Sequence, residues 1–410
     1  MIKSKNEGVN NMKIAFVSPG FVPVPAVEGG AIEKLMTYLI EQNEEKQHFE
    51  IDLYTIDHPE IHNMNFDGTN MYRIKLNFIG KCFDRIFNHF FWKYGIEKSF
   101  NQFGRKVSKI IQKQNYDYIL VENNMYLYKK LHSTVTAKYP STQFLYHLHN
   151  DIGKVDKPIS LCKYILTTAS CVITCSNYLK TRLLHVMDTD KVKVLYNVIN
   201  FNKLIYSEVG RNKIRKLHNL KDEFLYGYIG RISQEKGVLE LVKAFKKRYH
   251  KNKKLKLMII GDTLFKNTGS KYLNLVNKEI SDISDAVICT GSISNDKINE
   301  YMSAIDALVI PTICEEAFGI VAAEGLACER PILATQSGGM VEILNEGTAL
   351  IIDKNNIIDE LNNGMKIVEE NYEEYLQKSK KGRKQIIKNK QFHYDKYLEN
   401  FHEILVRNNK

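Results

Sequence analysis

The sequence contains no long hydrophobic run and none of the usual marks of an exported protein. No stretch approaches the roughly 20 apolar residues that cross a bilayer, and the first eleven residues, MIKSKNEGVNN, lack the apolar core of a signal peptide. Seven cysteines are scattered without a CxxC pair, which argues against a disulfide framework and against a structural zinc site. These absences predict a cytoplasmic protein with reduced thiols.

The chain is long enough for two domains, because 410 residues exceed what one hydrophobic core usually organises. Short β-rich apolar runs alternate with longer helical patterns, which is typical of βαβ units and of a parallel sheet covered on both faces. The expected strands are residues 14–17, 51–56, 118–121, 144–148, 172–174, 192–195, 224–229, 255–260, 286–289, 307–310, 332–334 and 350–352.

The domain boundaries follow from the polar segment 197–222, which carries no strong strand signal. We therefore expect an α/β fold with two doubly wound domains, residues 1–205 and 206–390. Apolar residues recur at helical spacing between Tyr394 and Leu405, so residues 391–410 should form a helix that packs back toward the N-terminal domain.

A glycine pair marks the first candidate ligand loop. Gly29 and Gly30 precede an expected helix, whose amide N–H groups and dipole would attract an anion. A glycine-rich connection with no ligand is the alternative at this point. The sequence has no GxGxxG here, which disfavours a nicotinamide-dependent oxidoreductase.

A more specific arrangement follows the strand expected at 224–229, in the order Gly-Arg-Ile-Ser-Gln-Glu-Lys-Gly. Arg231 lies at the strand end and Lys236 at the helix start, so both cations could converge on one diphosphate. The alternative is a solvated turn in which Glu235 pairs with either cation.

Two glutamates lie beyond the strand expected at 307–310. Glu316 falls in the loop and Glu324 in the following helix, separated by on the order of 12 Å at the helical rise. This distance is too long for a carboxylate dyad or for two ligands of one metal. It matches the span from a sugar to a ribose across a diphosphate.

Four blocks together resemble the retaining, nucleotide-sugar-dependent glycosyltransferases of family four. They are the Gly29-Gly30 loop, Gly230-Arg231 through Lys236-Gly237, Glu316 to Glu324 around Phe318-Gly319, and Gly338-Gly339 with Glu342 downstream. The resemblance implies the GT-B fold, in which two Rossmann-like domains face each other across a cleft. It also implies an N-terminal acceptor-binding domain and a C-terminal domain that binds the nucleotide sugar.

The resemblance also implies a role for each site residue. Arg231 and Lys236 would bind the donor diphosphate, with the backbone of Gly29 and Gly30 approaching it from the N-terminal domain. Glu324 would bind the ribose. The hydroxyls of the transferred sugar would meet Glu316 and the backbone of the residues that follow it, Phe318, Gly319 and Ile320. The sequence departs from many members at Asn197-Val198, where they have Asn-Gly.

Two histidines end the strand expected at 144–148. His147 and His149 are two residues apart and so share a face of the strand. The resemblance places His149 at a family position beside the donor sugar. His147 fits a core histidine whose hydrogen bonds are made within the protein. A two-histidine metal site has the right spacing but lacks an evident third ligand. Asp188-Thr189-Asp190 resembles a metal-binding DxD but falls in a polar turn, so we expect no metal.

The resulting expectation is a retaining, metal-independent hexosyltransferase. It would move a hexose or N-acetylhexosamine from a UDP-sugar, such as UDP-glucose, UDP-galactose or UDP-N-acetylglucosamine, to a saccharide or lipid-linked acceptor in cell-surface polysaccharide (capsule or exopolysaccharide) synthesis. The sugar nucleotide is then a co-substrate and no cofactor is needed. A nucleotide-sugar epimerase of the same fold, or a non-catalytic sugar- or nucleic-acid-binding protein, are the alternatives.

The net charge of +11 is concentrated in one segment. Residues 73–113 carry ten lysines and arginines against Asp84 and Glu97, interleaved with aromatic residues that include Trp92. This pattern suits an anionic membrane surface more than nucleic acid, which would place the protein peripherally on the inner face of the cell membrane. A core-facing amphipathic helix with a solvated basic face is the alternative.

Overall fold

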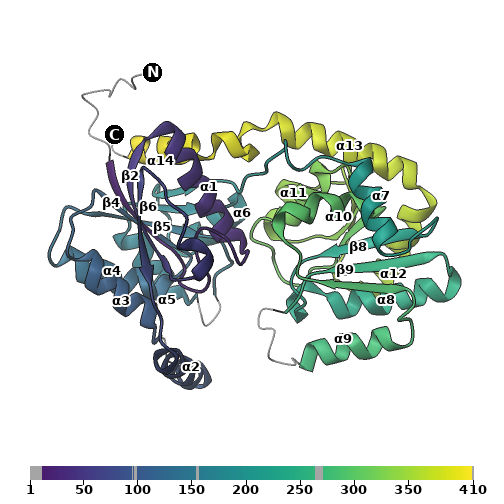
Figure 1. The fold of residues 1–410 in the computed structure, drawn as a ribbon, viewed down its shortest axis with the longest axis horizontal. Helices are drawn as coiled ribbons and strands as arrows, with labels where there is room; N and C mark the ends of the chain where they lie inside the picture. The colour runs from purple at the N-terminus through teal and green to yellow at the C-terminus, as the bar shows by residue number, and fades with distance from the viewer. Residues whose placement is uncertain (1–11, 95, 97–98, 154–156, 264–270, 409–410) are drawn as a thin grey trace. The chain divides into compact units, whose positions relative to one another are not determined.

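The computed structural model describes residues 12–94, 96, 99–153, 157–263 and 271–408. The chain divides into two compact units, one made of residues 1–196 and 395–410 and the other of residues 197–394. Each unit is a parallel sheet with helices packed along it (Figure 1). No helix among the described residues is both long and apolar enough to pass through a bilayer.

The first unit has a seven-stranded parallel sheet in the order β3-β2-β1-β4-β5-β6-β7. The order reverses between β1 and β4, which are hydrogen-bonded neighbours. Its elements are β1 (Met12–Val17), α1 (Ala31–Lys46), β2 (Phe49–Ile56), β3 (Thr69–Ile74), α2 (Phe78–Lys93), α3 (Gln102–Ile111), β4 (Tyr118–Glu122), α4 (Met125–Thr136), β5 (Gln143–Leu148), α5 (Ile159–Thr168), β6 (Cys171–Thr174), α6 (Asn177–Leu184), β7 (Val192–Val194) and α14 (Tyr397–Asn408).

The second unit has a six-stranded parallel sheet in the order β10-β9-β8-β11-β12-β13, which reverses between β8 and β11. Its elements are α7 (Glu208–Leu217), β8 (Phe224–Ile229), α8 (Val238–Lys251), β9 (Leu255–Ile260), α9 (Lys271–Ser281), β10 (Val287–Gly291), α10 (Ile298–Ala304), β11 (Ala307–Ile310), α11 (Ile320–Ala327), β12 (Ile332–Thr335), β13 (Leu350–Ile352), α12 (Ile357–Glu370) and α13 (Tyr372–Lys388).

All twelve expected strands are present, with bounds that differ by at most a few residues, and the structure adds β3. The central strands are apolar along their length because helices cover both faces of each sheet; every residue of β4 and β11 is buried. Ligands of such open sheets bind beyond the carboxyl ends of the strands, where the strand order reverses. The loops after β1, β4, β8 and β11 are therefore the expected ligand-binding loops.

The domain boundaries differ from the expected ones at 205 and 390. The division falls at 196/197 and at 394/395, because the start of the linker is bonded to the second unit. Ile199 donates its N–H to the carbonyl of Phe392 at 2.8 Å and accepts from the N–H of Tyr394 at 3.2 Å. The C-terminal helix begins at Tyr397, later than expected, after short 3-10 turns at Lys390–Phe392 and Tyr394–Lys396.

Helix α14 belongs to the first unit although 198 residues of the second unit precede it. Its residues Tyr397, Leu398, Phe401 and Leu405 are completely buried. The Phe401 ring meets Phe16 of β1 edge-on at 5.9 Å and Phe49 of β2 at 5.8 Å between ring centroids. The helix thus completes the core over the strands that lead to the first candidate loop.

Candidate functional site

The loop after β8 contains Arg231 and Lys236, and its path depends on glycine. Gly237 follows a 3-10 turn at Gln234–Lys236 and starts α8 with φ of 67°. A Cβ at this position would lie 2.0 Å from the carbonyl oxygen of Pro311. Only glycine therefore allows this turn to pack directly against the loop after β11.

Lys236 connects the loop after β8 to the loop after β11. Its Nζ lies 2.5 Å from Oε1 of Glu316, and both side chains are largely buried, with 22% and 16% exposed. The hydroxyl of Thr312 donates to the same carboxylate oxygen at 2.9 Å. A cation and an acceptor group are therefore held together at the switch point of the second sheet.

The downstream glycine pair supports the backbone of Glu316. Gly339 donates its N–H to the Glu316 carbonyl at 2.7 Å, and the Glu316 N–H donates to the hydroxyl of Ser337 at 2.9 Å. A Cβ at Gly338 would lie 2.2 Å from the Glu316 carbonyl oxygen. The Gly338-Gly339 block thus holds the backbone of Glu316 in place.

The residues after Glu316 begin α11. Phe318 is buried, and Gly319 takes φ of 90° immediately before Ile320, the first helical residue. A Cβ at Gly319 would lie 2.9 Å from Met340. Glu324 lies further along this apolar helix and is only 7% exposed.

Arg231 differs from Lys236 in its surroundings. Its guanidinium pairs with Glu235 at 3.1 Å, and the two side chains are 48% and 43% exposed. This is the pairing that the solvated-turn alternative describes. In the structure each of the two cations is thus paired with a different glutamate.

In the first unit, Gly29 and Gly30 precede α1 as expected, with φ of 85° and 96°. Glu33, in the first turn of α1, lies beside Gly30: a Cβ at Gly30 would be 2.2 Å from its Oε2. Burial raises the pKa of Glu33 to about 7, a hydrogen bond from its own backbone opposes this, and the charge of Glu122 adds to it. Glu33 was not among the residues expected at this loop.

We expect Glu33→Gln to remove a pH dependence of stability. A carboxyl whose pKa is about 7 in the folded protein, against 4.5 when exposed, stabilises the fold below pH 4.5 and loses this contribution as pH rises through 7. The contribution of this carboxyl to the free energy of unfolding therefore falls by up to about 3 kcal/mol across this pH range. Melting temperatures at pH 5 and pH 8 test this: relative to wild type, Glu33→Gln should gain stability at pH 8.

The matched control for Glu33→Gln is Glu45→Gln, an exposed position on the same helix. It should follow the wild-type pH profile. Identical pH profiles for Glu33→Gln and wild type would show that Glu33 is ionised in the folded protein.

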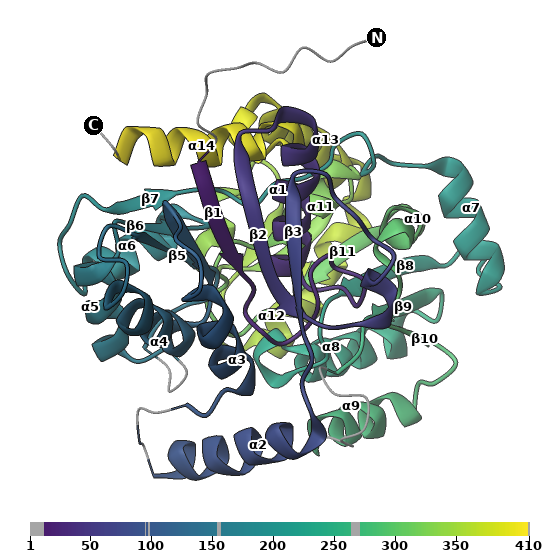
Figure 2. The ribbon, with the colours of Figure 1, turned by 60° about the vertical axis from the view of Figure 1, so that its left-hand side comes forward.

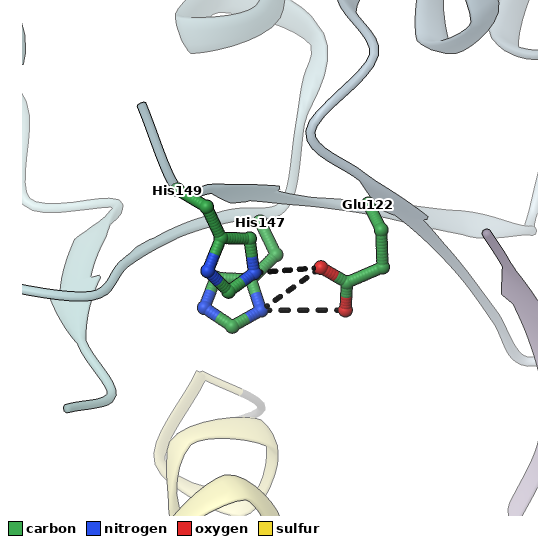
Figure 3. Close-up of side chains that lie close together, drawn as sticks. All are labelled: Glu122, His147 and His149. Carbon is green, nitrogen blue, oxygen red and sulfur yellow. Dashed lines mark hydrogen bonds and ion pairs between the residues drawn. The ribbon is translucent and has the colours of Figure 1, made fainter. Parts of the chain in front are cut away.

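His147 and His149 share a face at the end of β5, as expected, and meet a third residue that the sequence analysis missed (Figure 3). Glu122, the last residue of β4, faces both rings from one side: His149 Nε2 is 2.9 Å and His147 Nδ1 3.2 Å from its Oε2. All three side chains are buried. Their ligand atoms lie within 4.8 Å of one another, so the third potential metal ligand that the sequence did not reveal is present.

The hydrogen bonds of this cluster determine where the protons are. An ionised carboxylate only accepts, so each nitrogen facing Glu122 carries a proton. Burial lowers the pKa of His149 to about 4, with a further contribution from His147 and opposition from Glu122. The pKa of Glu122 is lowered to about 2, because its contacts with both histidines outweigh its burial. His149 Nδ1 is therefore an unprotonated acceptor at neutral pH.

The second nitrogens of the two rings point away from Glu122 to the same side (Figure 3). The ring centroids are 3.8 Å apart, and Nε2 of His147 is buried without a hydrogen-bond partner among the described residues. This pair is suited to a donor group such as a sugar hydroxyl. Asp188 and Asp190, in contrast, are exposed at the turn before β7.

Comparison with known proteins gives a consistent assignment. Residues 210–385 match the family described as Glycosyl transferases group 1. The chain is 27% identical over 232 residues, 56% of its length and 57% of the relative's, to the lipopolysaccharide 1,2-N-acetylglucosaminetransferase of Salmonella typhimurium. It is 28% identical over 207 residues, 47% and 50% of the two chains, to the capsular polysaccharide biosynthesis glycosyltransferase CapM of Staphylococcus aureus.

A solved structure resembles almost the whole chain. HepE of Anabaena, crystallised in complex with UDP, aligns with a TM-score of 0.74 over 97% of this chain and 100% of its own, at 19% identity. The two parallel-sheet units have the same architecture as the GT-B structures found by this comparison. Residues 210–385 are therefore similar to the group 1 glycosyl transferases, in a chain that has the GT-B fold.

Proposed function

We propose that the protein is a retaining glycosyltransferase that moves a hexose or N-acetylhexosamine from a UDP-sugar to a saccharide or lipid-linked acceptor. The observation that carries the proposal is the contact between Lys236 and Glu316, 2.5 Å long, at the switch point of the second sheet. It joins a cation suited to a diphosphate with a carboxylate suited to sugar hydroxyls. Relatives that make lipopolysaccharide and capsule support a cell-surface acceptor.

Donor binding would exchange two existing ion pairs for contacts with the substrate. Lys236 would turn from Glu316 to the diphosphate, and Glu316 would then accept hydrogen bonds from the transferred sugar. Arg231, already half exposed beside Glu235, would make the same exchange at the phosphates. Each cation thus keeps an anionic partner throughout, which avoids an unpaired charge in a partly buried site.

Catalysis would depend on stabilising the leaving nucleoside diphosphate. Negative charge develops on the phosphate oxygens as the bond to the anomeric carbon breaks, and Arg231 and Lys236 would stabilise that charge. The acceptor hydroxyl would attack from the same face and pass its proton to a donor phosphate oxygen. No protein nucleophile and no metal take part in this scheme.

The first unit would contribute the two imidazole acceptors. With Glu122 holding the protons of His147 and His149 on its own side, the opposite nitrogens would accept hydrogen bonds from hydroxyls of a sugar substrate. Glu122 is then a positioning residue, because it acts through the histidines.

A panel of UDP-, GDP- and ADP-sugars tests the proposed function. We expect the UDP-sugars to raise the melting temperature by a few degrees at saturating concentration and to release UDP slowly by hydrolysis. Stabilisation by a GDP- or ADP-sugar alone would contradict the choice of base. Formation of an epimer without hydrolysis or transfer would identify an epimerase, and the absence of any response would contradict an enzyme.

A further inference from the structure

Helix α2 places two polar residues, Asp84 and Asn88, on the face that contacts the rest of the first unit. Asp84 accepts a hydrogen bond from the Arg105 guanidinium at 3.1 Å. Asn88, four residues along the helix, bonds both the N–H of Phe100 at 2.7 Å and its carbonyl at 2.8 Å. The inward face of α2 is thus attached by these polar groups and by Phe87 and Phe91, whose ring centroids lie 4.7 and 5.9 Å from that of Phe100, which leaves most of its apolar residues outside the contact.

The outward face of α2 is a continuous apolar stripe. Its residues are spaced by four, three and four positions along the helix: Ile79, Phe83, Ile86 and Phe90, whose exposed fractions are 68%, 53%, 66% and 49%. Phe78 and Tyr94 extend the surface at the two ends, with 80% and 59% exposed. Single exposed apolar residues are common, but a contiguous group of this size marks an interaction surface.

Helices α2 and α3 both lie in the basic segment, residues 73–113, but α3 directs its apolar residues toward the core of the unit. Its apolar residues Phe103, Val107 and Ile111 are buried against the unit, at 1%, 0% and 0% exposed. This helix fits the core-facing alternative that the sequence left open. Helix α2 does not, because its apolar stripe faces away from the core.

A basic stripe flanks the apolar one. Arg85, His89 and Lys93 recur every four residues on one side of it, and all three are exposed. Asp84, the one acidic residue in the sequence of α2, lies on the inward face and is paired with Arg105. The outward surface therefore combines apolar and cationic groups with no carboxylate from the helix itself.

We propose that α2 docks the protein on an anionic bilayer, with the helix lying in the plane of the interface. The apolar stripe would enter the region between headgroups and acyl chains, and the basic stripe would meet the anionic headgroups. In Figures 1 and 2 the helix lies at the edge of the first unit. The proposal rests on the exposed face alone and does not depend on the transferase reaction.

Co-sedimentation of the full chain with vesicles tests the proposal. We expect binding to vesicles of phosphatidylcholine with phosphatidylglycerol, weaker binding at high salt, and little binding to phosphatidylcholine alone. The variant Ile79→Ser/Ile86→Ser removes two side chains for which the structure shows no ring contact or hydrogen bond, and it should bind at least about tenfold more weakly. The matched control, Val209→Ser/Leu217→Ser, changes residues of α7 that are 80% and 62% exposed and should bind like wild type.

Two controls keep the result interpretable. Thermal melts establish that both variants fold, and UDP-sugar hydrolysis in the absence of vesicles, expected to be unchanged, separates membrane docking from the chemistry. Wild-type protein that stays in the supernatant, or equal sedimentation of the α2 variant, would overturn the proposal. A wild-type dimer that becomes monomeric in the α2 variant, without vesicle binding by either, would assign the surface to a second copy instead.

Discussion

Replacing Lys236 with alanine is expected to lower turnover about 100- to 1,000-fold, the usual loss when one group that stabilises transition-state charge is removed. The effect should fall mainly on kcat, because the charge that Lys236 meets grows as the diphosphate leaves. Arg231→Ala should act in the same direction. Steady-state measurement of acceptor glycosylation, or of donor hydrolysis, gives the comparison.

The chain offers a matched control one residue away from Glu316. Lys354 pairs with Glu315 at 2.6 Å, so Lys354→Ala removes a similar ion pair beside the same loop. Its turnover should stay within about threefold of wild type. Unchanged turnover in both Lys236→Ala and Arg231→Ala would disprove the diphosphate assignment, and a large loss in Lys354→Ala would instead assign the site to Glu315.

Replacing Glu122 with glutamine is expected to reduce kcat/KM by at least about 100-fold through the protonation of the histidines. A carboxylate accepts from both His147 and His149, whereas an amide has one acceptor oxygen and a donor NH2 group. Both ring nitrogens lie near Oε2 of Glu122, and His147 Nδ1 also lies 3.3 Å from Oε1, so either orientation of the amide places its NH2 group against a ring nitrogen. The ring that faces the NH2 group must then present an acceptor nitrogen to it, and so it changes tautomer. Its opposite nitrogen then becomes a donor and no longer accepts from the sugar.

The tautomers themselves can be measured. Nitrogen NMR shifts of the imidazoles distinguish the two neutral forms, and Glu122→Gln should change one histidine and leave the other. Glu33→Gln, an equal change from acid to amide at a group that is coupled to Glu122 by charge, should leave both tautomers unchanged. Wild-type tautomers together with wild-type kcat/KM in Glu122→Gln would contradict the positioning role.

The fold was largely predictable because the parallel strands are buried on both faces. β8 and β11 are short apolar runs, and such runs are visible in a single sequence. β3 was missed because an edge strand with a half-exposed face alternates polar and apolar residues; it contains Asn70 and Arg73, and it packs Tyr72 on Tyr54 at 4.7 Å between ring centroids. The sequence pattern therefore identified every strand that the described residues form except this one edge strand of the first sheet.

The site residues that lie within one loop could be predicted from their motifs. The contacts between residues of different loops could not. The spacing of Arg231 and Lys236 places them in one turn, but it does not show that Lys236 binds Glu316, 80 residues later. Glu122 could have been noticed as a lone acid at the end of the buried run Tyr-Ile-Leu-Val-Glu. Its contacts with His147 and His149 could not have been predicted, because they depend on the pairing of β4 with β5 in the folded sheet.

The two crossings of the chain between the units have a consequence for biosynthesis. Residues 12–196 contain all the strands of the first sheet but not Tyr397, Leu398 and Phe401, which are fully buried in that unit. Residues 197–394 form the second unit as one continuous segment. The core of the first unit therefore stays incomplete until the whole second unit and then α14 have been synthesised, although its strands are made first.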